Sequence, residues 1–382
     1  MCAQLVSISG IGLSTSLGGY ADACAAHRAG LTRFSARDDF KIMSPGDDEP
    51  QAVTVSPVNN LFIYQGIAKT IRLIKSAYED LVGSLKGQPP QDVMVLLALA
   101  DPLDRELDLD LGSEATRAER LQTHMDALIE PLFNSINPDL NDAPMQAVYG
   151  DRIAFARVLK KATDFIAEGK AQHCLLLIAD SLLDEFALER QLENNQLKTN
   201  DNPVGYIPGE GAAAILVSAA SADKSKLLGI DVATDLTADV IQPLNANVDD
   251  NTHSTSDSVA AEDTSNKAKF GARLSDLIRK QVSSNEQPHW FPQIYSDMNG
   301  TESRAIEYGT LQVKLKQYYP QAHFLPEQIP ALTFGETGVL SGALALSMIF
   351  ASRERGYMSH KEHLIFLSES SGKRASIKVS VS

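Results

Sequence analysis

The chain has 382 residues, of which 43% are hydrophobic, and its formal net charge is -15. This length and apolar content are enough for a large buried core in one or two domains. The negative charge argues against nucleic acid or an anionic membrane as the main partner, because both attract clustered Lys and Arg. No apolar run approaches the roughly 20 residues of a membrane span, and the N-terminus does not resemble a signal peptide. We therefore expect a cytoplasmic protein.

The first predicted elements are a strand and two helices. The strand covers Leu5–Gly12, which alternates apolar and small residues before a Gly/Ser-rich turn. A helix over residues 20–30 ends at Gly30. A second helix over residues 63–85 is amphipathic, because five large apolar side chains fall on one face: Ile67, Ile71, Ile74, Tyr78 and Leu81.

Strands and helices then alternate along the chain. Nearly continuous apolar runs at residues 93–101 and 173–180 are typical of strands that are covered on both faces. An amphipathic helix is predicted between them over residues 153–169, and a third strand follows within residues 206–218. This alternation favours an α/β fold.

The second half of the chain repeats this order. Gly338 precedes a helix and an apolar strand, as Gly150 does in the first half, and residues 290–300 mirror the strand at 93–101. The repeat predicts two similar halves, an N-terminal half over residues 1–222 and a C-terminal half over residues 223–382. Residues 245–266 are rich in Ser, Thr, Asn and Asp and predict a flexible surface loop.

The cysteines and histidines predict no metal site. Cys2, Cys24 and Cys174 are far apart and odd in number, which indicates neither a disulfide framework nor a zinc site. Free cysteine is often buried, so we expect Cys24 and Cys174 to be small core residues rather than nucleophiles. The histidines are scattered, and the pair His360 and His363 lacks a third ligand in the sequence.

Searches for cofactor and catalytic motifs are largely negative. The chain has no CxxC, HExxH, GxSxG or P-loop pattern. The GEGAAA run from Gly209 has the spacing of a dinucleotide-binding fingerprint. That fingerprint needs a helix after it, whereas the apolar run here predicts a strand. The sequence therefore predicts no bound cofactor.

Four segments together resemble the β-ketoacyl synthases. They are VSISGIGLSTSLGG near the start, GYIPGEGAAAILV (similar to the family's GFVPGEGAGALVL), DMNGTESRAIEYGTL (where the family has HGTGT), and FGETGVLSGALAL (similar to GHTLGAAGALEA). They occur in the family's order and with its spacing, and the resemblance covers essentially the whole chain. It implies the thiolase fold, a five-layered αβαβα sandwich of two similar α/β halves.

The resemblance also implies that the catalytic residues have been replaced. A condensing ketosynthase needs a thiol nucleophile at the start of a buried helix and two histidines that assist decarboxylation and stabilise the enolate. The nucleophile position falls at Asp151 or Arg152, the histidine positions at Asn299 and Glu336, and a lysine position at Ala331. We therefore expect these five positions to be vestigial and the chain not to be an enzyme.

Two interpretations of these replacements remain open. In the first, Asp151 and Glu336 stabilise the starts of helices, and Arg152 pairs with Glu336 and fills the emptied pocket. In the second, these residues converge with Asn299 and Glu302 to form a different acid–base site. An acyl-enzyme on Asp or Arg is chemically poor beside a thiolate, which favours the first interpretation.

The resemblance suggests three functions. A fold without its catalyst favours a non-catalytic scaffold or adaptor, similar to thiolase-like proteins of bacterial type VI secretion, that assists the loading of an effector or adaptor. One alternative is a chain-length-factor-like partner of an active β-ketoacyl synthase, and another is an acyltransferase or condensing enzyme with relocated catalytic residues. Both non-catalytic functions imply protein partners. A homodimer is also expected, because thiolase-fold proteins normally dimerise through a central strand.

Overall fold

The computed structural model describes most of the chain, namely residues 4–44, 48–105, 116–220, 227–235, 242–243, 264–282 and 288–381. Ten of the described strands form one mixed sheet: β1 (Gln4–Ser14), β4 (Val93–Ala100), β5 (Met145–Gly150), β6 (His173–Ser181), β7 (Glu210–Ala219), β8 (Leu227–Asp235), β9 (Gln242–Pro243), β10 (Gln293–Tyr295), β11 (Glu362–Ser368) and β12 (Arg374–Val381). A separate hairpin pairs β2 (Ser35–Ile42) with β3 (Gln51–Val55).

Helices lie outside these strands on both sides and also between the strands of the two halves. The larger ones are α1 (Tyr20–Arg28), α2 (Gly66–Ser84), α3 (Arg117–Ile136), α4 (Ile153–Ala167), α5 (Glu185–Glu193), α6 (Thr264–Gln281), α7 (Glu302–Tyr318) and α9 (Ser341–Glu354). Two short ones, α8 (Ala331–Phe334) and the 3-10 helix η3 (Gly338–Leu340), lead into α9. None of the helices described is long and apolar enough to cross a membrane.

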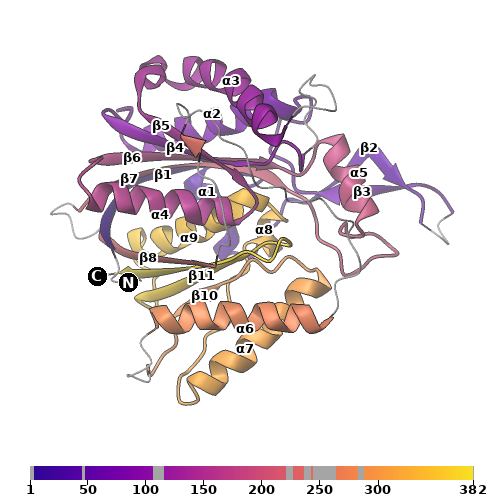
Figure 1. Cartoon of the computed structure of the whole chain (residues 1–382). Helices are drawn as coiled ribbons and strands as arrows, with labels where there is room; N and C mark the ends of the chain where they lie inside the picture. Colours follow the sequence, from indigo (N-terminus) through magenta and orange to yellow (C-terminus); the bar gives the residue numbers. More distant parts are fainter. Residues whose placement is uncertain are drawn as a thin grey trace.

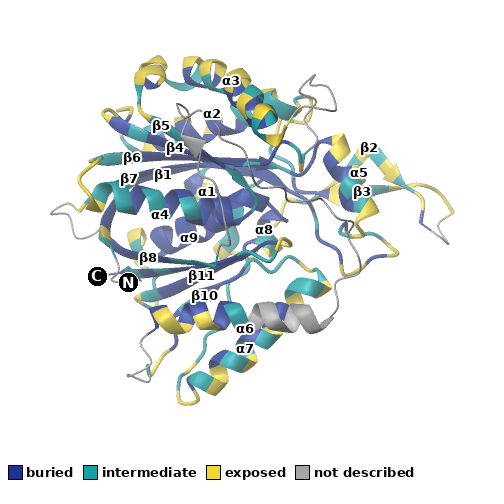
Figure 2. Cartoon of the chain, viewed as in Figure 1, coloured by how far each residue is buried: buried dark blue, intermediate teal, exposed yellow. Residues whose placement is uncertain are grey.

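The elements stack in five layers (Figure 1). Helices α2 and α3 cover one outer face, and α6 and α7 cover the other. The middle layer contains α1, α4 and α9, which lie between the strands of the first half and those of the second. One hydrophobic cluster surrounds the middle helices on both sides, and one further cluster lies beneath each outer pair of helices. Figure 2 shows the buried residues concentrated there. The expected αβαβα sandwich is confirmed.

The two halves arrange their strands in the same way. In the first half, β7 is antiparallel to both β1 and β6, and β6 is parallel to β4. In the second half, β12 is antiparallel to both β8 and β11, and β11 is parallel to β10. The strands predicted at residues 173–180 and 363–369 form β6 and β11, which therefore occupy equivalent places. Strand β10 has only three residues and is much shorter than β4, which the repeat in the sequence did not indicate.

Two predicted boundaries fall near residues that are not described. The division between the halves at residue 222 lies within 221–226 and stays a prediction. Most of the predicted loop at 245–266 is also outside the described residues, but its last three residues belong to the start of α6. The prediction of a loop is wrong for those three residues, because they begin a helix that continues to Gln281.

Helices α4 and α9 cross closely in the middle layer, and this crossing places the starts of both helices near each other. Nearly every residue of α9 is buried, as expected for a helix that is covered on all sides. At Gly342, an added Cβ would lie 2.4 Å from the Phe155 ring. The lack of a side chain at Gly342 therefore permits the close approach of the two helices.

Candidate functional site

Four of the five positions that the resemblance to ketosynthases singled out form one hydrogen-bonded cluster between the start of α4 and the segment before η3. Arg152 donates from Nη2 to Glu336 Oε2 at 2.5 Å and from Nη1 to Asp151 Oδ2 at 3.1 Å. Asn299, in the loop between β10 and α7, donates from Nδ2 to Glu336 Oε2 at 2.6 Å. Glu302 is exposed at the start of α7 and is not part of this buried cluster. The pairing of Arg152 with Glu336 agrees with the first interpretation. Asp151 makes no side-chain capping hydrogen bond at the start of α4, so its expected role at that helix start is not seen.

Arg152 and Glu336 are buried, but both side chains remain charged. The two residues are 7% and 3% exposed. Burial acts to raise the pKa of the Glu336 carboxyl, but the charge of Arg152 and hydrogen bonds from Arg152, Asn299 and the Gly338 N–H hold it below its usual range. Burial likewise opposes the charge of Arg152, but neighbouring carboxylates keep its pKa above the ordinary value. A charged ion pair therefore occupies the position of the expected catalytic residues.

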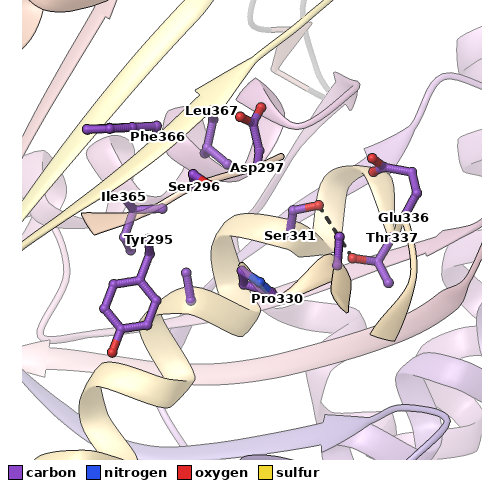
Figure 3. A pocket seen from close by; sticks show the side chains of 12 residues that line it. Tyr295, Ser296, Asp297, Pro330, Glu336, Thr337, Ser341, Ile365, Phe366 and Leu367 are labelled. Atoms are coloured by element: carbon purple, nitrogen blue, oxygen red, sulfur yellow. Dashed lines mark hydrogen bonds between the residues drawn. The ribbon is translucent and has the colours of Figure 1, made fainter. Parts of the chain in front are cut away.

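The space beside this ion pair is very small. Ala331, the fifth of these positions, lines a cavity together with Tyr295, Ser341 and Glu336, and Figure 3 shows the side chains that line it. The cavity volume is about 10 Å³, which is room for no more than about one water molecule. Pockets for small organic ligands are typically of the order of 300 Å³ or more. An acyl chain does not fit in this cavity.

Backbone N–H groups at the helix starts are bound by the chain's own carboxylates. The Gly338 N–H donates to Glu336 Oε1 at 2.8 Å, and the Ile153 N–H, at the start of α4, donates to Glu369 Oε1 at 3.1 Å. Such N–H groups are ready binding sites for anions. In acyl transfer, donors of this kind stabilise the negative oxygen that develops in the transition state. Here they have carboxylate partners already.

A second buried ion pair lies next to the first. Arg105 donates to both oxygens of Asp180, with distances of 2.9 Å and 2.8 Å, and the Asp180 side chain is 0% exposed. Asp180 Oδ2 also accepts from the Val339 N–H at 3.0 Å. An added Cβ at Gly338, whose φ is +52°, would lie 1.9 Å from Asp180 Oδ2. The glycine therefore lets the carboxylate approach the start of η3.

The charged network continues into the second half of the chain. Arg374 donates to both oxygens of Glu307, at 2.5 Å and 3.1 Å, and Arg304 donates to Glu307 at 3.2 Å. Asp297 accepts from the Ser368 N–H at 2.7 Å. Burial raises the pKa of Asp297, although the charges of Arg304 and Arg152 oppose this effect. Arg152 and Arg304 both donate to the Ser368 carbonyl, which links this network to the Arg152–Glu336 pair.

The sequence did not identify Arg105, Asp180 or Glu369 as residues of this site. Asp180 carries the clearest signal, because it follows a covered apolar strand, and functional side chains in α/β sheets often stand at that end. Arg105 and Glu369 belong to no sequence motif, and only the folding of the chain brings them to the site.

Neither described cysteine is a plausible replacement nucleophile. Cys24 and Cys174 are free and buried, as expected. Burial raises the pKa of both thiols to about 12, so they are protonated near neutral pH and the thiolate is scarce. Over the same described ranges, no group of three or more His, Cys, Asp or Glu side chains is arranged to hold a metal ion.

Acid is expected to destabilise the protein through His124. This imidazole on α3 is 2% exposed, its Nδ1 is 2.8 Å from the Tyr149 hydroxyl, and burial lowers its pKa to about 4. Between pH 6.5 and 4 the unfolded chain binds a proton that the folded chain excludes. The contribution of His124 to the free energy of unfolding should therefore fall by up to about 3 kcal/mol as the pH drops through this window.

The measurement is denaturant unfolding at several pH values from 7 to 4.5. His124→Gln should show a smaller loss of stability on acidification than the unchanged protein. His289→Gln makes the same substitution at an exposed position and is the matched control for the loss of an imidazole. An unaltered pH dependence in His124→Gln would show that His124 is not the group responsible.

Comparisons with known proteins give matches by structure alone. No protein-family model matches the sequence, and no curated protein matches it. The fold is similar to a solved structure described as the ishigamide ketosynthase/chain length factor, with 17% identity, a TM-score of 0.64 and coverage of 99% of both chains.

Other solved structures of similar length share this fold. One is a chain of a complex between a type II polyketide synthase acyl-carrier protein and its ketosynthase bound to a hexaketide, with 12% identity, a TM-score of 0.67 and full coverage of both chains. Another is a β-ketoacyl synthase from Burkholderia phymatum, with 12% identity, a TM-score of 0.62 and full coverage of both chains. The predicted thiolase fold is therefore confirmed.

Proposed function

We propose that this chain is a non-catalytic protein of the thiolase fold that acts by binding another protein. The observation that carries the proposal is the Arg152–Glu336 ion pair, which is buried at the positions where the resemblance to ketosynthases places the nucleophile and a catalytic histidine. A guanidinium that stays charged is a very poor nucleophile. A carboxylate that is paired with it is a poor nucleophile compared with a thiolate. The pair therefore removes the chemistry of the fold while keeping its shape.

Two further features support the loss of acyl transfer. Glu336 and Glu369 accept hydrogen bonds from N–H groups at the helix starts, so a substrate carbonyl must compete with charged groups that are already in place. The adjoining cavity of about 10 Å³ has no room for an acyl group. An enzyme with relocated catalytic residues would need a different pocket and an activated nucleophile. The thiols of Cys24 and Cys174 are not activated, because burial raises the pKa of both.

Two kinds of protein partner have different support. The likeness to a structure described as a ketosynthase/chain length factor supports a chain-length-factor-like subunit that pairs with an active β-ketoacyl synthase. The role of an adaptor in type VI secretion, which loads an effector or another adaptor, rests on the resemblance of the sequence alone. Dimerisation with a second copy of the chain stays a prediction.

Affinity purification from the cells that produce the protein tests this function. We expect a stoichiometric protein partner, and its identity separates the two roles: a ketosynthase indicates a chain-length-factor-like subunit, whereas a secretion adaptor or effector indicates a scaffold. The double variant Arg152→Met/Glu336→Gln should keep the partner, because it changes only buried residues. If this variant is folded but no longer retains the partner, the site takes part in function and the proposal is wrong.

A further inference from the structure

Three histidines surround the single tryptophan of the chain, Trp290, which shortly precedes β10. The ring of Trp290 lies 5.1 Å from that of His323, 5.2 Å from that of His360 and 5.8 Å from that of His289, measured between centroids. The rings of His289 and His323 are themselves 5.0 Å apart. We refer to these four residues as the ring cluster.

The backbone beneath the ring cluster is firmly held. The His323 N–H donates to the His289 carbonyl and the Phe291 N–H donates to the His323 carbonyl, both at 2.9 Å. Next to Trp290, Phe291 points inward, is 1% exposed and stacks on Phe324 with 4.7 Å between ring centroids. The outward rings are therefore displayed on a rigid, packed base.

The ring cluster is accessible to a partner. Trp290 is 46% exposed, and His289 and His323 are also exposed. An indole that is held rigidly at the surface loses little conformational freedom on binding, and tryptophan is enriched among residues that dominate binding energy at protein interfaces. The indole and imidazole N–H groups are hydrogen-bond donors for a carboxylate.

Basic residues lie in and beside the segment between α9 and β11, which carries His360 of the ring cluster. Lys361 follows His360 directly and is exposed, and Arg355, at the end of α9, is also exposed. Arg28 stacks over the ring of Tyr357, in the same turn, at 4.2 Å from its centroid. These cations stand out in a chain whose net charge is -15. Charge complementarity therefore favours an acidic partner.

We propose that the ring cluster, together with Arg28, Arg355 and Lys361, binds an acidic segment of the partner protein. This inference rests on the proposed function, since it assigns the surface through which a protein partner is bound. The indole supplies apolar contact area, the ring N–H groups donate to carboxylates, and the three cations attract the acidic chain.

The single tryptophan makes the surface directly observable. Fluorescence of Trp290 is recorded while a poly-glutamate peptide is added to the full chain in low salt with EDTA, and poly-lysine is added in a parallel titration. We expect a saturable change with poly-glutamate only, and an apparent affinity at least tenfold weaker in high salt, because exposed charges are screened. A missing or non-saturable response to poly-glutamate would overturn the proposal.

A matched pair of charge reversals tests the location of the binding surface. Lys361→Glu should weaken binding of poly-glutamate at least tenfold. Lys170→Glu makes the same change of charge at an exposed position of the first half, and it should leave binding within about twofold. Equal effects of the two variants would contradict the assignment. A fluorescence response that appears only without EDTA would contradict it too, because it would indicate bridging by a metal ion.

The two proposals fail in different experiments. A negative peptide titration leaves the non-catalytic function standing, because the partner then binds elsewhere. An acyl adduct on the protein would overturn the non-catalytic function but leave the peptide titration unchanged.

Discussion

Replacing Arg152 by Met is expected to lower the free energy of unfolding by about 3–5 kcal/mol. The substitution leaves the Glu336 carboxylate 3% exposed without its counter-charge, and Asn299 and the Gly338 N–H are then its remaining partners. The cost of a buried, unpaired charge is large because the interior solvates it poorly. Equilibrium denaturant unfolding at pH 7 measures the change.

The control for this prediction neutralises both members of the pair. In Arg152→Met/Glu336→Gln, the amide of Gln can still accept from the Gly338 N–H. The carboxylate that then loses its partner is that of Asp151, whose side chain is 30% exposed and can be solvated by water. Replacing a whole buried ion pair is often nearly neutral, so the double variant should regain most of the lost stability. If Arg152→Met costs less than about 1 kcal/mol, or the double variant is no more stable than the single one, the charges do not interact as described.

Replacing Asp180 by Ala is expected to cost a similar 3–5 kcal/mol. The substitution removes both acceptors of Arg105 and the acceptor of the Val339 N–H. Burial opposes the charge of Arg105, and the Asp180 carboxylate is the main group that keeps the pKa of Arg105 above its ordinary value. Without Asp180 the guanidinium must find other partners or expose itself to water.

The matched control for Asp180 is an ion pair of the same length at the surface. Glu168 accepts from Lys170 at 2.7 Å, but the two side chains are 53% and 63% exposed. Glu168→Ala should therefore cost less than about 1 kcal/mol. Comparable losses in Asp180→Ala and Glu168→Ala would mean that burial does not set the strength of the Arg105–Asp180 pair.

The sequence predicted the elements whose side chains leave few alternatives. The apolar runs that become β4, β6 and α9 are buried from all sides, so nearly every position must be apolar. Helix α3 was missed, although Thr116 and Glu119 form a capping box at its start. Its apolar side chains are interrupted by polar residues and by Pro131, which makes its helical period weaker than that of α2 or α4.

The site was predicted only where family resemblance assigned the positions. Asp151, Arg152, Asn299 and Glu336 meet as expected, because the fold brings the starts of the same helices together. The second ion pair was not foreseen, since Arg105 and Asp180 are 75 residues apart and neither belongs to a motif. Such pairs depend on packing in three dimensions, which residue spacing does not reveal.

The most direct test of the central claim is the intact mass of the protein after incubation with acetyl and malonyl thioesters of coenzyme A. An active β-ketoacyl synthase, treated in the same way, serves as the positive control and should gain the mass of an acyl group. We predict an unchanged mass for this protein and no release of coenzyme A above the rate without protein. A stoichiometric acyl adduct on any residue would contradict the account, because it would show that the site retains a working nucleophile.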